Sequence, residues 1–243
     1  MLLYKNKILI TGGSGRFGQV LRDNSFKYKY EFLFPTKKEL DILQPSSIEK
    51  YILKKKPKYL MHLAGLSRPM EMHDTYISES IDKNIIGTAN ITKICFKYKI
   101  KLIYVSTCYV YPGIKGSYHE DDPLLPINNY AWSKLGGESS VQMYKNSLIL
   151  RASITEKPFV HQSAFVDFKT NFIFHEDLIP GILKIIDKKG VVNIGGKSQS
   201  VYNFAKKYDP KIKKIKAKKL LGKSARINLS MNINKFKKII NQK

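Results

Sequence analysis

The sequence predicts an α/β fold with a doubly wound parallel sheet and a smaller C-terminal portion. Three observations lead to this prediction. Short apolar runs of strand length alternate with longer runs of helical period over most of the chain. The first apolar run passes directly into a glycine-rich turn that opens a helix. Polar residues follow several of the apolar runs, at the sheet edge where α/β proteins bind ligands.

Length and composition fit a globular protein with a large core. The chain has 243 residues, of which 43% are hydrophobic, enough for one domain or for one domain with a small appendage. No apolar run is long enough to cross a bilayer, so we expect no membrane partner. The sequence passes from Met1 into a strand pattern without a signal-peptide layout. With only Cys95 and Cys108 as cysteines, a reducing cytoplasm is the expected location.

The net charge of +24 raises the question of nucleic acid binding. Most of the basic residues are lysines scattered over the whole chain, so we expect no nucleic acid partner. The exception is the lysine-dense segment 206–219, which is either a solvated face or an attractor of an anionic ligand. No residue pattern predicts a metal site.

The first strand, Lys7–Thr11, leads into a turn with glycines at Gly12, Gly15 and Gly18, and a helix is expected over Gln19–Asn24. Glycines at a strand-to-helix turn let backbone N–H groups approach a pyrophosphate, whose charge the helix N-terminus favours. The turn therefore predicts a dinucleotide site.

The second strand, Tyr30–Phe34, ends where such a site would hold the adenosine ribose. An acidic residue there would bind a free 2′-hydroxyl, but Thr36, Lys37 and Lys38 follow instead. Together with Arg16 they could hold a 2′-phosphate, so NADP(H) is preferred and NAD(H) stays open. The alternative is that these lysines are ordinary surface residues.

The remaining elements continue the alternation, and the sequence contains no internal repeat. Further strands are expected at Tyr59–Leu63, Lys101–Ser106, Ser147–Arg151 and Val191–Ile194. Helices are expected from Ser46 or Ser47 to Lys55, over Asp74–Tyr98, over Tyr130–Tyr144, over Glu176–Asp187 with a break near Pro180 and Gly181, over Ser200–Lys207 and over Asn232–Ile240.

Tyr130 and Lys134 lie four residues apart and therefore on one helical face. A cation beside a phenol favours the phenolate and lowers the tyrosine pKa from its usual value of about 10. Such a tyrosine can exchange a proton with a carbonyl or alcohol oxygen. Taken alone, the pattern more often indicates a packed tyrosine beside a solvated lysine.

Several motifs together resemble those of the extended short-chain dehydrogenase/reductases, a Rossmann-fold family. The segment 11–18 resembles their TGxxGxxG turn, and Tyr130–Lys134 resembles their YxxxK motif. Four further segments are similar to family motifs: Asp41-Ile42, the strand end His62–Gly65, the N-x-x-G-T stretch Asn84–Thr88 and the S-T-x-x-V-Y stretch Ser106–Tyr111. They occur in the family's order over residues 7–155.

Within this family the sequence is most similar to sugar-nucleotide reductases of the dTDP-4-dehydrorhamnose reductase type. The similarity covers Leu40–Ile42, Lys56–Leu60 and Ser106–Gly113. Two departures concern Cys108, where the family usually has an aspartate, and a C-terminal half that is shorter than usual.

The resemblance implies a role for individual residues. Thr107 would hydrogen-bond the reacting oxygen, Tyr130 would donate the proton, and Lys134 would hold the nicotinamide ribose. The other implied cofactor contacts are Gly12, Ser14, Gly15, Arg16, Phe17, Gly18, Asp41, Ile42, Leu63, Ala64 and Gly65. The implied substrate is a nucleotide sugar, and a homodimer is compatible with the sequence.

The implied domains are a cofactor-binding part over residues 1–155 and a small substrate-binding region over 156–243, interleaved with the last sheet elements. Aromatic residues in segment 159–174 would stack on the nucleotide base or pack in the core.

The functional hypotheses are a reductase of a nucleotide-linked 4-keto sugar, an epimerase on the same scaffold, a non-catalytic NADP-binding regulatory subunit, and a nucleic acid binder. A 4,6-dehydratase is disfavoured because Cys108 and Tyr109 stand where such relatives carry an Asp-Glu pair. Related epimerase-reductases place a cysteine base at the position of Tyr109, so Cys108 is interpreted as a packed residue rather than a base.

Overall fold

The structure of the chain is a computed structural model that describes residues 6–222 and 224–241. Its largest sheet has six strands in the order β10-β5-β4-β3-β1-β2. These strands are β1 (Lys7–Thr11), β2 (Glu31–Leu33), β3 (Tyr59–His62), β4 (Lys101–Thr107), β5 (Ser147–Ala152) and β10 (Gly190–Ile194). β1 pairs in parallel with both β2 and β3, and β3 pairs in parallel with β4. The predicted α/β class with a parallel sheet is confirmed.

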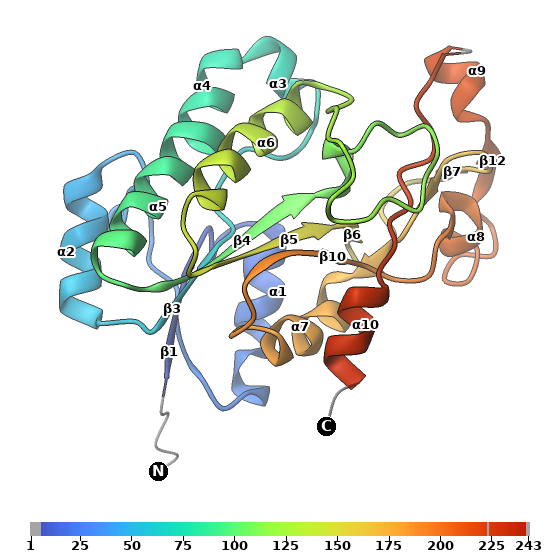
Figure 1. Cartoon of the computed structure of the whole chain (residues 1–243). Coiled ribbons are helices and arrows are strands. Elements are labelled where there is room, and N and C mark those ends of the chain that lie inside the picture. Colours follow the sequence, from blue (N-terminus) through green and yellow to red (C-terminus); the bar gives the residue numbers. More distant parts are fainter. Residues whose placement is uncertain (1–5, 223, 242–243) are drawn as a thin grey trace. The chain divides into compact units, whose positions relative to one another are not determined.

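Helices cover both faces of the strands β1, β3 and β4. Figure 1 shows α1 on one side of these strands and α2, α5 and α6 on the other. Their bounds are α1 (Arg16–Asn24), α2 (Pro45–Lys55), α5 (Gly87–Lys97) and α6 (Asn129–Gln142). Ile8, Leu9 and Ile10 of β1 are fully buried, as expected for a strand that is covered on both faces. No helix in the described part of the chain is long and apolar enough to cross a membrane.

The strand order reverses direction at β1, since β2 lies on one side of it and β3 on the other. In open α/β sheets ligands bind at such a switch point, outside the carboxyl ends of the strands. Thr11 at the end of β1 is in register with His62 at the end of β3. The topology therefore places the glycine turn and the Leu63–Gly65 segment at the same edge.

Two helix predictions need correction. The expected helix Asp74–Tyr98 is divided into α3 (Met72–Thr75), α4 (Ile77–Ile81), a π-helical segment η2 (Asp82–Ile86) and α5, with non-helical dihedrals at Tyr76. Ser46 and Ser47 do not cap α2, because Pro45 already occupies its first turn. The Ser47 hydroxyl instead accepts a hydrogen bond from the Asp41 N–H at 3.0 Å.

The later part of the chain contains short strands and small helices. They are η3 (Cys108–Val110), β6 (Ile154–Thr155), β7 (Ser163–Phe165), β8 (Lys169–Thr170), β9 (Ile173–Phe174), α7 (His175–Lys184), β11 (Gln199–Ser200), α8 (Val201–Ala205), β12 (Lys213–Ile215), α9 (Ala217–Leu221) and α10 (Asn234–Asn241). The predicted break near Pro180 is wrong, since α7 continues through it. Gly181 serves packing instead: a Cβ there would lie 2.6 Å from the Phe236 ring.

The chain forms two compact units. Unit 1 comprises residues 1–106, 129–150 and 186–191, and unit 2 comprises 107–128, 151–185 and 192–243. The core of unit 1 contains Leu9, Leu60, Leu102 and Ile149 from four of the strands, packed with residues of α2 and α5. The predicted division near residue 155 stays a prediction.

Candidate functional site

The turn after β1 contains glycines for different reasons. Gly12 has a φ of +74°, and a Cβ there would lie 2.5 Å from the Ala64 nitrogen. At Gly18 a Cβ would lie 2.3 Å from the Gly12 carbonyl oxygen, so α1 packs directly on the turn. A Cβ at Gly15 meets only that same oxygen, at 3.3 Å. Packing therefore requires Gly12 and Gly18, whereas a side chain at Gly15 would make only this one close contact.

Gly15 also begins α1. Its N–H donates to the Gly12 carbonyl at 3.0 Å, and its carbonyl accepts from the Gln19 N–H at 2.8 Å. It occupies the N-cap position, where it supplies no side-chain oxygen. A helix N-terminus favours anions because its N–H groups point outward and its dipole is positive there. The turn is thus suited to a phosphate group.

A cavity of about 300 Å³ lies beside this turn, entirely within unit 1. Its lining residues are Thr11, Gly12, Gly13, Ser14, Gly15, Pro35, Lys37, Leu40, Asp41, Ile42, Leu43, Leu63, Ala64, Gly65 and Lys83. They come from the ends of β1 and β3, the segment after β2 and the helical segment η2. Most of the cofactor contacts implied by the sequence are among them.

The exceptions are Arg16, Phe17, Gly18, Tyr130 and Lys134, which are not in the cavity lining. Arg16 donates a hydrogen bond to the Ser67 hydroxyl at 2.9 Å, and Phe17 is buried. Of the two lysines predicted to face the ribose, Lys37 lines the cavity and Lys38 does not.

The polar rim of the cavity is built around Asp41. One of its carboxylate oxygens accepts the Leu43 N–H at 2.9 Å, and the other lies 3.9 Å from the Lys37 ammonium. Lys83, on the η2 side, pairs with Glu79 one turn earlier. The rim therefore carries two lysines, each beside a carboxylate.

A buried hydrogen-bond chain fixes the two strand ends under the cavity. The Thr11 hydroxyl and His62 Nδ1 are 2.7 Å apart, and His62 Nε2 lies 3.1 Å from the Thr88 hydroxyl on α5. Burial, assisted by the charge of Lys134, lowers the pKa of His62 to about 3. His62 is therefore a neutral structural ring at physiological pH.

Asn84 joins the cavity wall to α6. Its side-chain amide exchanges hydrogen bonds with both backbone groups of Leu66, at 2.7 and 2.9 Å, and donates to the Ser133 hydroxyl at 2.8 Å. Ser133 in turn donates to the Tyr130 carbonyl at 2.8 Å. The segment after β3 and the first turn of α6 are thus held by one buried side chain.

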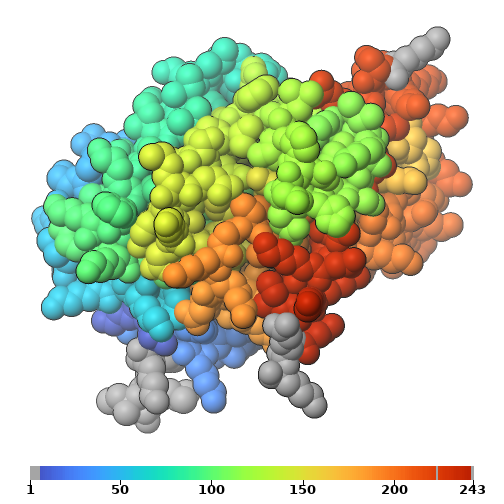
Figure 2. All heavy atoms as spheres, in the orientation of Figure 1, coloured from blue at the N-terminus to red at the C-terminus, as the bar shows by residue number. Residues whose placement is uncertain are grey.

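Tyr130 and Lys134 occupy the first two turns of α6, also in unit 1. α6 packs against α5, and Figure 2 shows the two segments side by side, α5 in green and α6 in yellow-green. The Lys134 ammonium lies over the Tyr104 ring, 4.1 Å from its centroid, and the Tyr104 hydroxyl donates to the Lys134 carbonyl at 3.1 Å. Burial lowers the pKa of Lys134 to about 7, although the Glu138 carboxylate acts in the opposite direction. The lysine can therefore change its charge near neutral pH.

Thr107 and Cys108 follow at the end of β4 and belong to unit 2. Thr107 is buried, and its hydroxyl accepts the Tyr109 N–H at 3.3 Å. Cys108 is fully buried near Ser153 and Thr170, and burial raises the pKa of its thiol to about 11. So little thiolate is available at neutral pH that Cys108 is a poor base.

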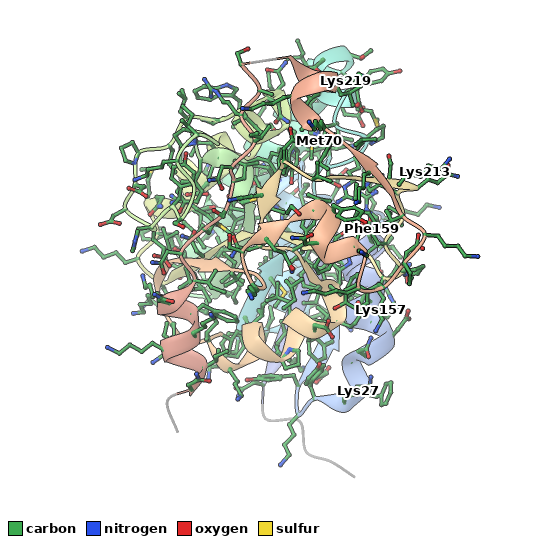
Figure 3. The ribbon with its side chains drawn as sticks, turned by 90° about the vertical axis from the view of Figure 1, so that its right-hand side faces the viewer. Lys27, Met70, Lys157, Phe159, Lys213 and Lys219 are labelled. Carbon is green, nitrogen blue, oxygen red and sulfur yellow. The ribbon has the colours of Figure 1, made fainter. Side chains whose placement is uncertain are left out.

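In unit 2 the aromatic residues of segment 159–174 pack mainly on one another and on α8. Phe159, Phe172 and Phe174 all lie within 6.4 Å of the Phe204 ring, measured between centroids. Several of the lysines in segment 206–219 are exposed. Figure 3 shows the labelled Lys213 and Lys219 on β12 and α9. Exposure of these lysines agrees both with a solvated face and with an attractor of an anionic ligand.

Sequence reasoning missed several residues of the site. Glu138 is buried and accepts a hydrogen bond from the Ser106 hydroxyl at 2.5 Å; its position four residues after Lys134 was the available signal. Lys83 and Tyr104 carry no comparable signal in the sequence. Within residues 6–222 and 224–241, no group of three His, Cys, Asp or Glu side chains is arranged to hold a metal ion.

These residues fit a dinucleotide. The absence of a side chain at Gly15 and the N-terminus of α1 suit a pyrophosphate. Leu40, Ile42 and Leu43 supply an apolar wall for a base. The cavity volume lies at the lower end of the usual range for small-molecule sites, roughly 300 to 1,000 Å³.

Solved structures share this fold. dTDP-4-dehydrorhamnose reductase from Bacillus anthracis, in complex with NADP, has a TM-score of 0.84 and 24% identity over 96% of this chain and 92% of that chain. The Bordetella bronchiseptica enzyme WbmG, in complex with NAD and UDP, has a TM-score of 0.77 and 17% identity over 97% of this chain and 89% of that chain.

Sequence comparison adds curated relatives and a family. Methionine adenosyltransferase 2 subunit beta of Xenopus laevis is 29% identical over 156 residues, which are 61% of this chain and 46% of that protein. dTDP-4-dehydrorhamnose reductase of Mycolicibacterium smegmatis is 27% identical over 56% of this chain and 41% of that protein. The chain thus spans less than half the length of these relatives. The family model described as the RmlD substrate binding domain matches residues 6–164, and the chain belongs to this family.

Proposed function

We propose that the protein is an NAD(P)H-dependent reductase of a nucleotide-linked 4-keto-6-deoxy sugar, a type of reaction used in the synthesis of surface polysaccharides. Two features of unit 1 carry the proposal. One is the cavity beside the glycine turn, which is suited to a phosphate group. The other is the Tyr130–Lys134 pair on α6, a helix that is hydrogen-bonded to Asn84 beside the cavity. The family and the dTDP-4-dehydrorhamnose reductases among the relatives support the choice of substrate.

In this proposal three residues have defined tasks in the reaction. A bound reduced nicotinamide supplies the hydride for the ketone carbon. The Tyr130 hydroxyl donates the proton to the ketone oxygen, and the Thr107 hydroxyl orients that oxygen. The Lys134 ammonium holds the cofactor ribose and stabilises the phenolate that remains on Tyr130.

NADP(H) is the proposed cofactor, with NAD(H) accepted less well. Lys37 supports this preference because it lines the cavity after β2, while the sole carboxylate in the lining, Asp41, is already engaged by Leu43 and Lys37. We further propose that residues 1–155 supply the cofactor site and that residues 156–243 contribute to the sugar-nucleotide site.

A second candidate is a non-catalytic subunit. Its support is that several curated relatives carry the name methionine adenosyltransferase 2 subunit beta. The epimerase alternative has less support, because the buried, high-pKa thiol of Cys108 is unsuited to removing a proton.

The test is a reductase assay on a panel of nucleotide 4-keto-6-deoxy sugars carrying dTDP, GDP or UDP, followed by the loss of NADPH absorbance. We expect turnover with at least one of them, highest with dTDP-4-dehydrorhamnose. Tyr130→Phe keeps the ring and removes the hydroxyl, so turnover should fall by about 10²-fold or more while NADPH still binds. NADPH binding without turnover of any substrate would favour the subunit, and turnover by Tyr130→Phe at the parent rate would exclude Tyr130 as the acid.

A further inference from the structure

The short helix α3 contacts the first turn of α6 at two points. The His73 ring meets the Tyr130 ring edge-on, with centroids 5.1 Å apart and an interplanar angle of 62°. Beside it, the Asn129 side-chain amide donates to the Asp74 carboxylate at 2.8 Å. One contact is apolar and the other polar, so together they constrain both the position of the turn and the rotation of the tyrosine ring.

His73 is itself held from its opposite side. Its Nδ1 lies 2.6 Å from the Ser80 hydroxyl on α4, and both residues are buried. The imidazole therefore cannot rotate away from Tyr130 without breaking a buried hydrogen bond. The same side chain therefore bonds to Ser80 through one edge and packs on an aromatic ring through another.

The other ring nitrogen of His73, Nε2, is less well satisfied. Nε2 of His73 is buried, and within the described part of the chain no group reaches it with full hydrogen-bond geometry, although the Ser67 backbone acts on the ring. A buried polar atom without a partner is unfavourable, and a hydrocarbon ring would avoid it. Packing alone therefore does not account for a histidine here.

The charge state of the ring is also set by its surroundings. Burial lowers the pKa of His73; the Ser67 backbone and Asp74 act against this shift, and Lys134 reinforces it. A neutral imidazole adds no positive charge beside the Tyr130 ring.

We propose that His73 is a positioning residue for Tyr130, which it holds by ring contact in the orientation needed to protonate the substrate oxygen. This proposal rests on the proposed function, in which Tyr130 is the acid. It concerns the direction of the phenol and leaves the cofactor cavity unaffected, since His73 is not in the cavity lining.

Two substitutions separate the ring contact from the Ser80 bond. His73→Phe keeps the ring and loses the bond, whereas His73→Asn keeps an amide that can reach Ser80 and loses the ring. With NADPH and dTDP-4-dehydrorhamnose we expect kcat to fall about 10-fold or more in His73→Asn and less than about 3-fold in His73→Phe. The Kd for NADPH, measured by its fluorescence, should stay within about 2-fold of the parent value in both. His175→Asn, at another buried histidine in unit 2, controls for loss of a buried imidazole; it should lower the thermal midpoint and leave the Kd for NADPH unchanged.

A double-mutant cycle tests whether His73 acts through the Tyr130 hydroxyl. In the Tyr130→Phe background, His73→Asn should cause no further loss of kcat, because the group it orients is gone. Equal loss in His73→Phe and His73→Asn, an additive double mutant, or a weakened Kd for NADPH in step with kcat would each overturn the proposal.

A measurement without substrate separates this proposal from the proposed function. Amide hydrogen exchange in the turn 130–134 should be faster in His73→Asn than in His73→Phe and in the parent protein. If no keto sugar is reduced, the proposed function fails while this exchange result still supports positioning. Unchanged exchange in His73→Asn would contradict positioning even in an active enzyme.

Discussion

At the scale of single residues, the proposed chemistry depends most on the charge of Lys134. Its ammonium lies over the Tyr104 ring, and burial lowers its pKa to about 7. The neighbouring His62, with its pKa lowered to about 3, stays neutral over the working range. Lys134 is therefore the group of this cluster that titrates near neutrality.

We expect the affinity for NADH to depend on pH through Lys134. A ribose hydroxyl that accepts from the ammonium favours its charged form, so binding requires the proton. The Kd should be constant below pH 7 and rise by up to about tenfold per unit above it, as the free lysine loses its proton. The Kd is measured at each pH from the fluorescence of NADH. NADH is used because NADPH carries a 2′-phosphate whose own ionisation would change with pH. Lys134→Met should bind more weakly and show no such dependence; a parent Kd that is flat from pH 6 to 9 would contradict the assignment.

The glycines of the turn should respond differently to substitution. Gly15→Val should abolish NADPH binding and leave the protein folded, because the new side chain makes only one close contact and would enter the space proposed for the pyrophosphate. Gly18→Ala is the contrasting variant: its Cβ would lie 2.3 Å from a backbone oxygen, so it should destabilise the fold by about 1–3 kcal/mol. Urea unfolding and NADPH titration of both variants check this. A stable Gly15→Val protein with the parent affinity would remove Gly15 from the phosphate site.

At the scale of elements, the π-helical segment η2 connects the cofactor cavity with the helix that carries Tyr130. It turns Asn84 toward both Leu66 and Ser133, while the backbone carbonyl of Asn84 accepts from the Thr88 hydroxyl at 2.8 Å. π-helical turns recur at functional sites, and this one brings three segments to a single amide.

Asn84→Ala should therefore affect stability and cofactor binding together. The substitution removes three hydrogen bonds and leaves buried partners unsatisfied, which we expect to cost about 2–4 kcal/mol in the free energy of unfolding. Asn90→Ala, on α5, removes a single part-buried bond to the Ile42 carbonyl and is the matched control, expected to cost about 1 kcal/mol or less. Urea unfolding measures both, and equal effects of the two substitutions would contradict a linking role for Asn84.

The sequence predicted those elements whose structure depends on a local residue pattern. The strands β1, β3 and β4 and the glycine turn could be predicted because buried parallel strands are continuous apolar runs and the turn needs glycines. The division of Asp74–Tyr98 into four segments could not, since its helical period is uninterrupted and tertiary packing decides where it bends. The same holds for His73 and Tyr104, whose roles arise from neighbours distant in the sequence.

At the scale of the whole molecule, the two units are interleaved along the chain. The chain passes from one unit to the other within β4, β5 and β10. Each of these strands is a continuous element that contributes residues to both units. We therefore expect the units to unfold together in one cooperative transition, as most compact domains do.

Binding of NADPH should test this cooperativity, because the cavity that we assign to it lies entirely in unit 1. A ligand that binds only the folded state stabilises it by about 2.7 kcal/mol at a concentration 100-fold above Kd. Trp132, the single tryptophan of the chain, lies on α6 and reports unit 1 by fluorescence, whereas far-ultraviolet circular dichroism reports both units. For one cooperative transition the two signals should coincide and move together to higher temperature with NADPH. A fluorescence transition that moves while part of the dichroism transition stays in place would show instead that unit 2 unfolds independently.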